Sequence, residues 1–272
     1  MSESSVAIAV RNLTAAYGDE IVLRDVSFEV GRGEVFVVMG GSGSGKSTLM
    51  RHMVGLEQPR EGRVLYDGVG LWEVGAPERE SILRRCGVMY QGGALWSSMT
   101  LAENVALPLE YATSLSPRRV RELVRVKLAL VGLTGFGDYY PSEISGGMRT
   151  RAGLARAMAL DPDILFFDEP TAGLDPVRAN RMDDLIVELR DSLRTTVVIV
   201  THRLPTIFAV ATNSVFLDGE TKTVLAQGDP RRLREECEYS KVREFLTGEE
   251  AVSAGDGAAA SARNLGRREE QR

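Results

Sequence analysis

The sequence predicts an α/β fold built on a mixed sheet, and three observations support this fold class. Residues 35–39 are apolar on both faces, and the glycine-rich run GGSGSGKST follows them and leads into a helix expected over 46–56. Further apolar strands are expected at 164–167 and 196–200. Between about residues 92 and 150, strand-like runs give way to helical spacing, which indicates an inserted helical subdomain.

The amino-terminal forty residues are expected to form strands, because apolar residues alternate there with small or polar ones. The alternating positions are Val6, Ile8, Val10, Val26, Phe28 and Val30. In the helical insertion, the apolar residues at helical spacing are Val120, Leu123, Val124 and Val131. One face of a helix between the two later strands is marked by Val177, Leu185, Ile186, Leu189 and Leu193. Short strands are expected at 215–217 and 223–226.

Composition and charge are those of an ordinary globular protein. The chain has 272 residues, of which 43% are hydrophobic and 26% charged, and its formal net charge is -5. Because charges of both signs are interspersed, no nucleic-acid partner is expected. No apolar run approaches the ~20 residues of a membrane-spanning helix, so we expect a soluble chain that another subunit brings to any membrane. Cys86 and Cys237 lack metal-like spacing, and the small, polar residues 248–272 are expected to be disordered.

The run from residue 40 to residue 47 matches the phosphate-binding pattern GxxxxGK[ST] in full. In such a loop, backbone N–H groups at a helix amino terminus surround the phosphates. Lys46 is expected to bridge the β and γ phosphates, and the Ser47 hydroxyl to bind Mg²⁺. A flexible Gly/Ser turn is the alternative, but the strand before it and the helix after it favour phosphate binding. The expected nucleotide contacts are Gly40, Gly41, Ser42, Gly43, Ser44, Gly45, Lys46, Ser47 and Thr48.

Two acids follow the buried strand expected at 164–167. Asp168 is expected to hold hydrated Mg²⁺, and Glu169, pointing the other way, to polarise the water that attacks the nucleotide. Paired acids at a strand end are often solvated turn residues. The phosphate-binding loop in the same chain favours the catalytic interpretation.

A further motif, Ser145-Gly146-Gly147, stands at the start of an expected helix. Ser145 can cap this helix, and the first N–H groups offer a second anion site, although an ordinary capped helix is the alternative. Preceded by Ile144 and followed by Met148-Arg149-Thr150-Arg151, this segment resembles the signature sequence that separates ABC ATPases from other phosphate-loop proteins. The resemblance covers about residues 6–247 and implies a phosphate-loop NTPase of ABC type, with an antiparallel β subdomain and a helical insertion at about 92–150.

The remaining ABC elements occur in their expected order. Tyr17 resembles the aromatic residue that stacks on adenine, and Gln91 resembles the Q-loop residue that contacts Mg²⁺ and the attacking water. Asp175 lies in a segment similar to the D-loop, and His202 resembles the switch histidine that contacts the γ-phosphate. The resemblance thus implies a catalytic set of Lys46, Gln91, Glu169 and His202. It implies metal ligation by Ser47, Gln91 and Asp168.

One copy of each motif is present, and in ABC ATPases two such domains pair head to tail around ATP. The resemblance therefore implies a homodimer, or a heterodimer with a similar chain. ATP would hold the dimer closed, and hydrolysis assisted by Glu169 would release it. This cycle would move membrane subunits that dock near Gln91 and the helical insertion.

Met148 ends the signature where most ABC members have Gln. With the runs YQGGAL at 90–95 and NVALPL at 104–109, it resembles the Mla/Mce lipid-transport ATPases of bacteria. That resemblance implies phospholipid transport between inner and outer membranes with a permease, an MCE-domain protein and, in some systems, a STAS-domain subunit. It also implies a peripheral position on the cytoplasmic face of the inner membrane. Arg203 departs from the acid that many relatives carry after the switch histidine.

Three other functions remain open from sequence. An importer of polar solutes such as amino acids would make Met148 a neutral replacement. A soluble ABC ATPase of DNA repair or translation would need long coiled coils or two ATPase domains, for which this chain lacks room. An inactive ATP-binding scaffold is opposed by the presence of Lys46, Asp168, Glu169 and His202.

Overall fold

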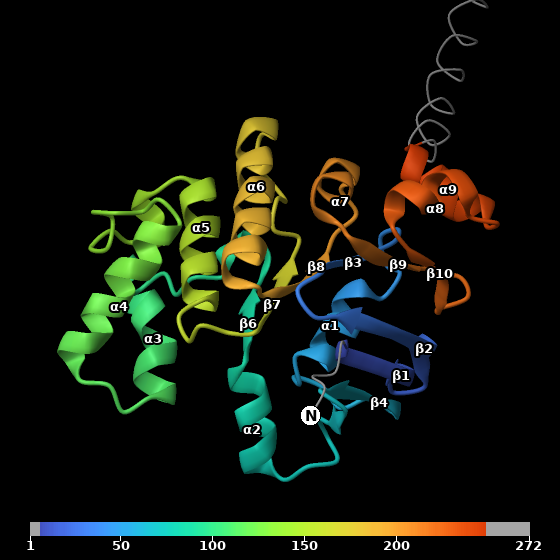
Figure 1. Cartoon of the computed structure of the whole chain (residues 1–272), viewed down its shortest axis with the longest axis horizontal. Helices are drawn as coiled ribbons and strands as arrows, with labels where there is room; N and C mark the ends of the chain where they lie inside the picture. The colour runs from blue at the N-terminus through green and yellow to red at the C-terminus, as the bar shows by residue number, and fades with distance from the viewer. Residues whose placement is uncertain (1–5, 249–272) are drawn as a thin grey trace, which may run out of the picture.

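The computed structural model describes residues 6–248, and two sheets organise this part of the chain (Figure 1). The smaller sheet has the strand order β2-β1-β4-β5, and its neighbouring strands are antiparallel. Its members are β1 (Val6–Tyr17), β2 (Glu20–Gly31), β4 (Glu61–Tyr66) and β5 (Val69–Gly70). The hairpin of β1 and β2 confirms the strands expected in the first forty residues, although both strands are longer than the alternation indicated.

The larger sheet has the order β10-β9-β3-β8-β7-β6. Its neighbours pair in parallel, except that β10 is antiparallel to β9. Its members are β3 (Val35–Met39), β6 (Cys86–Met89), β7 (Ile164–Asp168), β8 (Thr196–Val200), β9 (Asn213–Leu217) and β10 (Val224–Gly228). This mixed sheet and the antiparallel sheet beside it confirm the predicted fold class.

The helices of the inserted region lie together beside β6, on the left of Figure 1. They are α3 (Leu101–Ala112), α4 (Pro117–Leu130) and α5 (Gly146–Ala157), with short 3-10 turns η1 (Gln91–Gly93) and η2 (Pro141–Glu143). The other helices are α1 (Lys46–Met53), α2 (Ala76–Arg84), α6 (Pro176–Leu193), α7 (Leu204–Val210), α8 (Pro230–Glu236) and α9 (Ser240–Thr247). None of the helices in the described range is long and apolar enough to cross a membrane.

Local sequence explains where several of these helices begin. The Thr100 hydroxyl accepts from the Glu103 N–H at 3.2 Å, and the Glu103 carboxylate accepts from the Thr100 N–H at 2.7 Å. This reciprocal capping box starts α3. Ser116 caps α4 immediately before Pro117, whose fixed φ suits the first helical position. The helical insertion therefore follows from capping signals as well as from apolar spacing.

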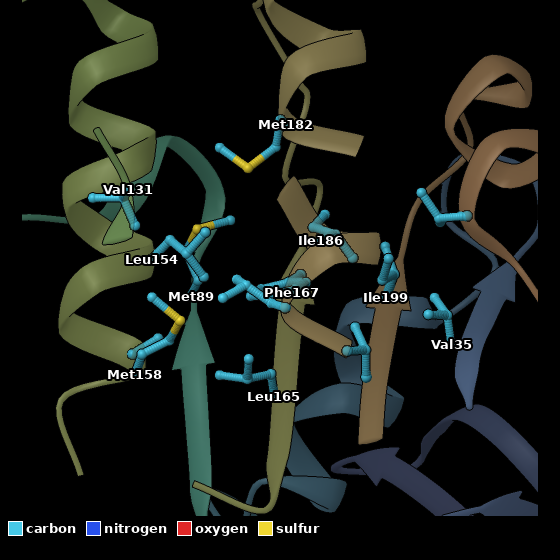
Figure 2. Close-up of a cluster of buried hydrophobic side chains, with 14 of the residues drawn as sticks. Val35, Met89, Val131, Leu154, Met158, Leu165, Phe167, Met182, Ile186 and Ile199 are labelled. Carbon is cyan, nitrogen blue, oxygen red and sulfur yellow. The ribbon is translucent and has the colours of Figure 1, made fainter. Parts of the chain in front are cut away.

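The central strands β3, β7 and β8 of the six-stranded sheet are buried on both faces, and successive side chains of a strand point to opposite sides. In β3, Val35 and Val37 pack into a core formed with α5 and α6, whereas Phe36 and Val38 pack into a second core with α1 and the antiparallel sheet. Phe36 stacks on Phe28 of β2, with ring centroids 5.2 Å apart. Figure 2 shows the first core, with side chains from the strands and helices meeting at Met89, Leu154, Met158, Leu165, Phe167, Met182, Ile186 and Ile199.

One expected helix limit and two residues expected on a buried helix face need correction. Helix α1 ends at Met53 rather than at residue 56, because Gly55 adopts a left-handed φ of 72° just beyond it. On α6, Val177 is 62% exposed and Leu193 is 50% exposed, so neither belongs to the buried face. These two residues lie at the ends of the helix, and the buried face between them is completed by Ala179, Met182 and Asp183.

Other elements had no counterpart in the sequence-based expectation: β4, β5, α2, α7 and the pair α8–α9. The last pair is tied to the rest of the fold by Lys241 of α9, whose Nζ lies 2.6 Å from the buried Asp218 carboxylate. Helix α9 ends at Thr247, and the domain limit expected at residue 247 stays a prediction. The tail expected to be disordered lies outside the described residues except for Gly248.

Candidate active site

The predicted catalytic residues follow four neighbouring parallel strands at the same edge of the sheet. The phosphate loop follows β3, Asp168 ends β7, His202 follows β8 and Gln91 follows β6. The register aligns Val38 with Val200 and Val200 with Asp168. Carboxyl ends of parallel strands form the usual ligand-binding edge of an α/β sheet. The topology therefore brings these segments together.

Two glycines of the loop are required by space as well as by conformation. Gly40 has φ 149°, and a Cβ there would lie 2.3 Å from the carbonyl oxygen of Leu217. Gly45 has φ 91°, and a Cβ there would lie 2.6 Å from Leu23 Cδ2. Any larger residue would push the loop away from β9 or β2. The loop is thus fixed to the sheet on one side and ends at the amino terminus of α1.

Lys46 is folded back onto its own loop. Its Nζ donates to the carbonyl oxygens of Gly40 at 2.9 Å and Gly41 at 2.6 Å, and lies 3.4 Å from Ser44 Oγ. The residue is only 8% exposed. Burial lowers the pKa of Lys46, while the nearby carboxylates of Glu169 and Asp168 act to raise it. The ammonium group is therefore held at the loop, close to two negative side chains.

The two acids differ in their surroundings. Burial, followed by the charge of Glu169, raises the pKa of Asp168, while Arg51 and Lys46 act to lower it. Glu169 adopts a left-handed φ of 48°, which costs about 1–2 kcal/mol for a residue with a Cβ. Its backbone N–H donates to the Val200 carbonyl at 2.9 Å. The strained backbone turns the Glu169 side chain toward the segment after β8.

That segment holds both oxygens of Glu169. The Thr201 hydroxyl donates to Oε2 at 2.9 Å, and His202 Nδ1 lies 2.6 Å from Oε1. Thr201 was not among the residues predicted from sequence, although it immediately precedes His202. A carboxylate fixed at both oxygens beside an imidazole can orient a water molecule and accept its proton. The imidazole remains largely exposed, so it can also reach a ligand.

Tyr17 ends β1 with an exposed ring. Its hydroxyl donates to the Glu57 carboxylate at 3.0 Å and lies 3.4 Å from Arg51 Nη1. These contacts attach the ring to α1 and the turn after it, next to the phosphate loop. Glu57 and Arg51 were not expected to support Tyr17. Such an anchored, exposed ring can stack on a flat ligand without losing much conformational freedom.

The signature and the segment similar to a D-loop form a second group. Ser145 caps α5, with its Oγ accepting from the Met148 N–H at 3.3 Å, and Asp175 caps α6 by accepting from the Arg178 N–H at 3.0 Å. A Cβ on Gly147 would lie 3.3 Å from Arg178 Cδ, so the two helix starts are in contact.

This second group lies away from the phosphate loop of the same chain. In Figure 1, α5 stands to the left of β6, whereas α1 lies to the right, beneath β3. The structure therefore brings together the residues at the sheet edge but does not bring Ser145 to Lys46. Gln91 is exposed at the start of η1, and Met148, in the first turn of α5, is partly buried against the hydrophobic core.

Comparison with known proteins places this geometry in a family. Residues 23–172 match the family model described as ABC transporter. The chain belongs to the ABC transporter family. As a family member it binds ATP or ADP and is an ATPase, as the motifs predicted. The expected ABC-type fold is also confirmed by solved ATP-binding cassettes.

Similar proteins cover most of the chain. A protein of Mycobacterium leprae named "Probable ribonucleotide transport ATP-binding protein mkl" is 41% identical, over 89% of this chain and 69% of that protein. The "Intermembrane phospholipid transport system ATP-binding protein MlaF" of Escherichia coli K12 is 36% identical, over 90% of this chain and 91% of MlaF. Among solved structures, dimeric MJ0796 bound to ADP and Pi gives a TM-score of 0.74 at 30% identity, covering 82% and 98% of the two chains. CbiO1 of Clostridium perfringens gives 0.77 at 27% identity, covering 86% and 92%.

Proposed function

We propose that this chain is the ATPase of a bacterial ABC transporter that moves phospholipid between the inner and outer membranes, with residues 6–247 as its ATPase domain. The main support for phospholipid as the substrate is the similarity to MlaF, which extends over about nine tenths of both chains. The Met148 variant of the signature, which we associate with lipid-transport ATPases, supports the same substrate.

The phosphates of ATP bind along residues 40–48 in this proposal, and adenine stacks on Tyr17. Ser47, Gln91 and Asp168 offer a hydroxyl, an amide oxygen and a carboxylate, which are the hard oxygen donors that Mg²⁺ prefers. Asp168 and Glu169 are adjacent carboxylates, and a cation bound there would offset their two negative charges. When bound, Mg²⁺ would neutralise charge on the phosphate oxygens.

Glu169 acts as the general base, because its carboxylate is oriented by two neighbours and a proton acceptor is needed at the attacking water. His202 contacts the γ-phosphate through the part of the ring that does not face Glu169. Lys46 leaves the loop carbonyls and bridges the β and γ phosphates. Gln91 orients the water from the end of β6.

A second copy of the chain completes each site. Ser145, Gly146 and Gly147 of one copy contact the ATP held by the phosphate loop of the other, with Asp175 near the same interface. The exposed helix start at Ser145 and its separation from α1 support this arrangement (Figure 1). The site would be incomplete in one copy alone, which is why we propose a homodimer.

Replacement of Ser145 with Arg is expected to reduce ATP turnover about 30-fold or more, because a bulky cation enters the centre of the interface. Steady-state hydrolysis and ATP binding to the phosphate loop are the measurements. Ser116→Arg is the matched control, since Ser116 also caps a helix through a hydroxyl that accepts from the N–H three residues on. Equal turnover in both variants would contradict the shared site.

The permease is proposed to dock in the groove between the Gln91 segment and α3. This groove has a volume of about 610 Å³ and is lined largely by apolar residues. At its mouth, Trp96 is 60% exposed and Tyr111 is 86% exposed. Large aromatic side chains left in solvent beside a groove are typical of an interface that a partner covers. Docking there holds the chain peripherally at the cytoplasmic face of the inner membrane.

An MCE-domain protein is the proposed further partner, with a STAS-domain subunit as an additional one. The alternative is an ATPase of an importer for polar solutes such as amino acids. The name of the Mycobacterium relative refers to ribonucleotide transport, whereas the MlaF relatives are named for phospholipid transport and support the lipid substrate. The two substrate classes differ in the partners that should accompany the chain.

Purification of the tagged complex from native membranes distinguishes these functions, with mass spectrometry of the proteins and lipids that accompany the chain. We expect a permease, an MCE-domain protein and phospholipid enriched over a mock purification. A permease with a solute-binding protein and no enriched phospholipid would contradict the lipid proposal and leave the ATPase assignment intact. Recovery of no membrane protein would contradict a transporter role.

A further inference from the structure

A buried chain of hydrogen bonds lies behind the Glu169–His202 pair. Thr171 Oγ1 and Thr206 Oγ1 are 3.0 Å apart, and Thr206 Oγ1 donates to Asp183 Oδ2 at 3.2 Å. Asp183 is only 3% exposed, and both threonines are almost completely buried. These hydrogen bonds join three segments: the turn after Glu169, helix α7 and helix α6.

Arg203 adds a second connection to the same turn. Its Nη1 donates to the Thr171 carbonyl at 2.6 Å, and that carbonyl also accepts from the Leu174 N–H at 3.3 Å. Arg203 directly follows His202. Thr171 is therefore held by its hydroxyl, through Thr206, and by its carbonyl, through Arg203, both from the segment that follows His202.

The Glu169 backbone has a particular need for such support. Its φ of 48° lies in the left-handed region, and a non-glycine residue stays there only where the surrounding structure holds it. The Ala172 N–H donates to the Glu169 carbonyl at 3.1 Å, so Thr171 lies inside the turn that fixes this conformation. A shift of Thr171 would therefore move the carboxylate of Glu169 relative to Thr201 and His202.

We propose that Asp183 is a positioning residue for ATP hydrolysis, which acts through Thr206 and Thr171 to hold Glu169 and the D-loop segment in their working geometry. The inference rests on the roles proposed above for Glu169 and His202. Asp183 itself touches neither the nucleotide site nor the signature.

The Asp183 carboxylate determines which hydroxyl donates in each of the two hydrogen bonds. An ionised Asp183 only accepts, so Thr206 donates to it and Thr171 donates to Thr206. Asp183 Oδ1 is buried and has no hydrogen-bond partner among residues 6–248. A buried charge with one unsatisfied oxygen is unfavourable for folding, so the proposal gives Asp183 a role other than stability.

The electrostatic surroundings of Asp183 also make its ionised form unfavourable for folding. Desolvation raises its pKa from 3.8 to about 6, while Thr206 and Arg203 act to lower it and Asp184 acts to raise it. A folded-state pKa above the unfolded value means that the ionised group destabilises the fold. This cost begins as pH rises above about 4 and is fully present above about 6.

Asp183→Asn therefore separates activity from stability. We expect kcat for ATP to fall about fivefold, because the amide oxygen of Asn accepts from Thr206 more weakly than the carboxylate does, while KM changes less than about twofold. The melting temperature is expected to rise at pH 8, because the buried charge is gone, and to change little at pH 4. The wild-type dependence of kcat on pH near 6 should weaken in this variant. A purely structural role predicts a lower melting temperature instead.

Two variants of Thr206 test whether its hydroxyl links Asp183 to Thr171. Thr206→Val removes the hydroxyl at nearly constant volume and should lower kcat as much as Asp183→Asn does. Thr206→Ser retains the hydroxyl and should preserve most of kcat. Asp191→Asn is the matched control, because Asp191 is an exposed carboxylate on the same helix and should leave kcat unchanged.

Glu169→Gln, measured in parallel on the full-length protein, separates the positioning role of Asp183 from the general-base role of Glu169. Loss of turnover in Glu169→Gln together with kcat within about twofold of wild type in Asp183→Asn and Thr206→Val would overturn the positioning role alone. Normal turnover in Glu169→Gln would overturn the proposed site on which the inference rests. Reduced kcat in both Asp183→Asn and Thr206→Val, with rescue by Thr206→Ser, is the expected result.

Discussion

Glu169→Gln is expected to lower kcat by about 10²–10⁴-fold, the usual contribution of a positioned general base. The amide has nearly the same shape, and its oxygen can still accept from the Thr201 hydroxyl, which now donates to Oε2 at 2.9 Å. It cannot take a proton from water. ATP binding should be retained, because the phosphate loop and Lys46 are unchanged. Hydrolysis under saturating Mg-ATP and equilibrium binding of labelled ATP are the two measurements.

Glu188→Gln provides the control, since Glu188 is an exposed carboxylate on α6. It should turn over ATP at the wild-type rate. Steady-state turnover of Glu169→Gln equal to that of the control would refute the general-base role. Loss of ATP binding in Glu169→Gln would indicate that the carboxylate supports the nucleotide site rather than the chemical step.

Lys46→Ala is expected to weaken ATP binding about 10- to 100-fold, the range for hydrogen bonds made by a charged group, and to abolish measurable turnover. The ammonium group already makes hydrogen bonds to the Gly40 and Gly41 carbonyls, so it lies where phosphate oxygens would approach. Truncation removes both the charge and these contacts. Isothermal titration with ATP, with Mg²⁺ present, measures the loss.

The control for this variant is Lys127→Ala. Lys127 is also buried and ion-paired, with Asp161 as its partner, but it belongs to the helical insertion. Its loss should leave the affinity for ATP unchanged, even if the melting temperature falls. An affinity of Lys46→Ala for ATP within about twofold of wild type would contradict the proposed phosphate contact.

The positions of Lys46, Asp168 and His202 could be predicted from sequence, because each follows a strand that is apolar along its whole length. Parallel strands bring their carboxyl ends to one edge, so the strand ends alone place these side chains near one another. The contact of Thr201 with Glu169 could not be predicted, because it depends on the register of β7 against β8. The Asp183–Thr206 bond likewise joins residues of two helices whose packing no local pattern reveals.

Missed strands have a similar explanation. In β4, only Val64 and Tyr66 are buried, so its apolar alternation is too short to identify a strand. Gly62 lies within it at φ 77°, where a Cβ would be 2.2 Å from the Asn12 carbonyl oxygen. A glycine in such a run predicts a turn from sequence, whereas here it permits close approach to β1. Tertiary contact, rather than local preference, determines this strand.

In the proposed dimer, ATP joins the phosphate loop of one copy to the signature of another. Light scattering during gel filtration of Glu169→Gln, with and without Mg-ATP, measures this association. We expect the mass of one chain without ATP and of two chains with ATP, and a return to one chain when Ser145→Arg is added. A variant that binds ATP yet keeps the mass of one chain, or a dimer that Ser145→Arg leaves intact, would contradict the shared site.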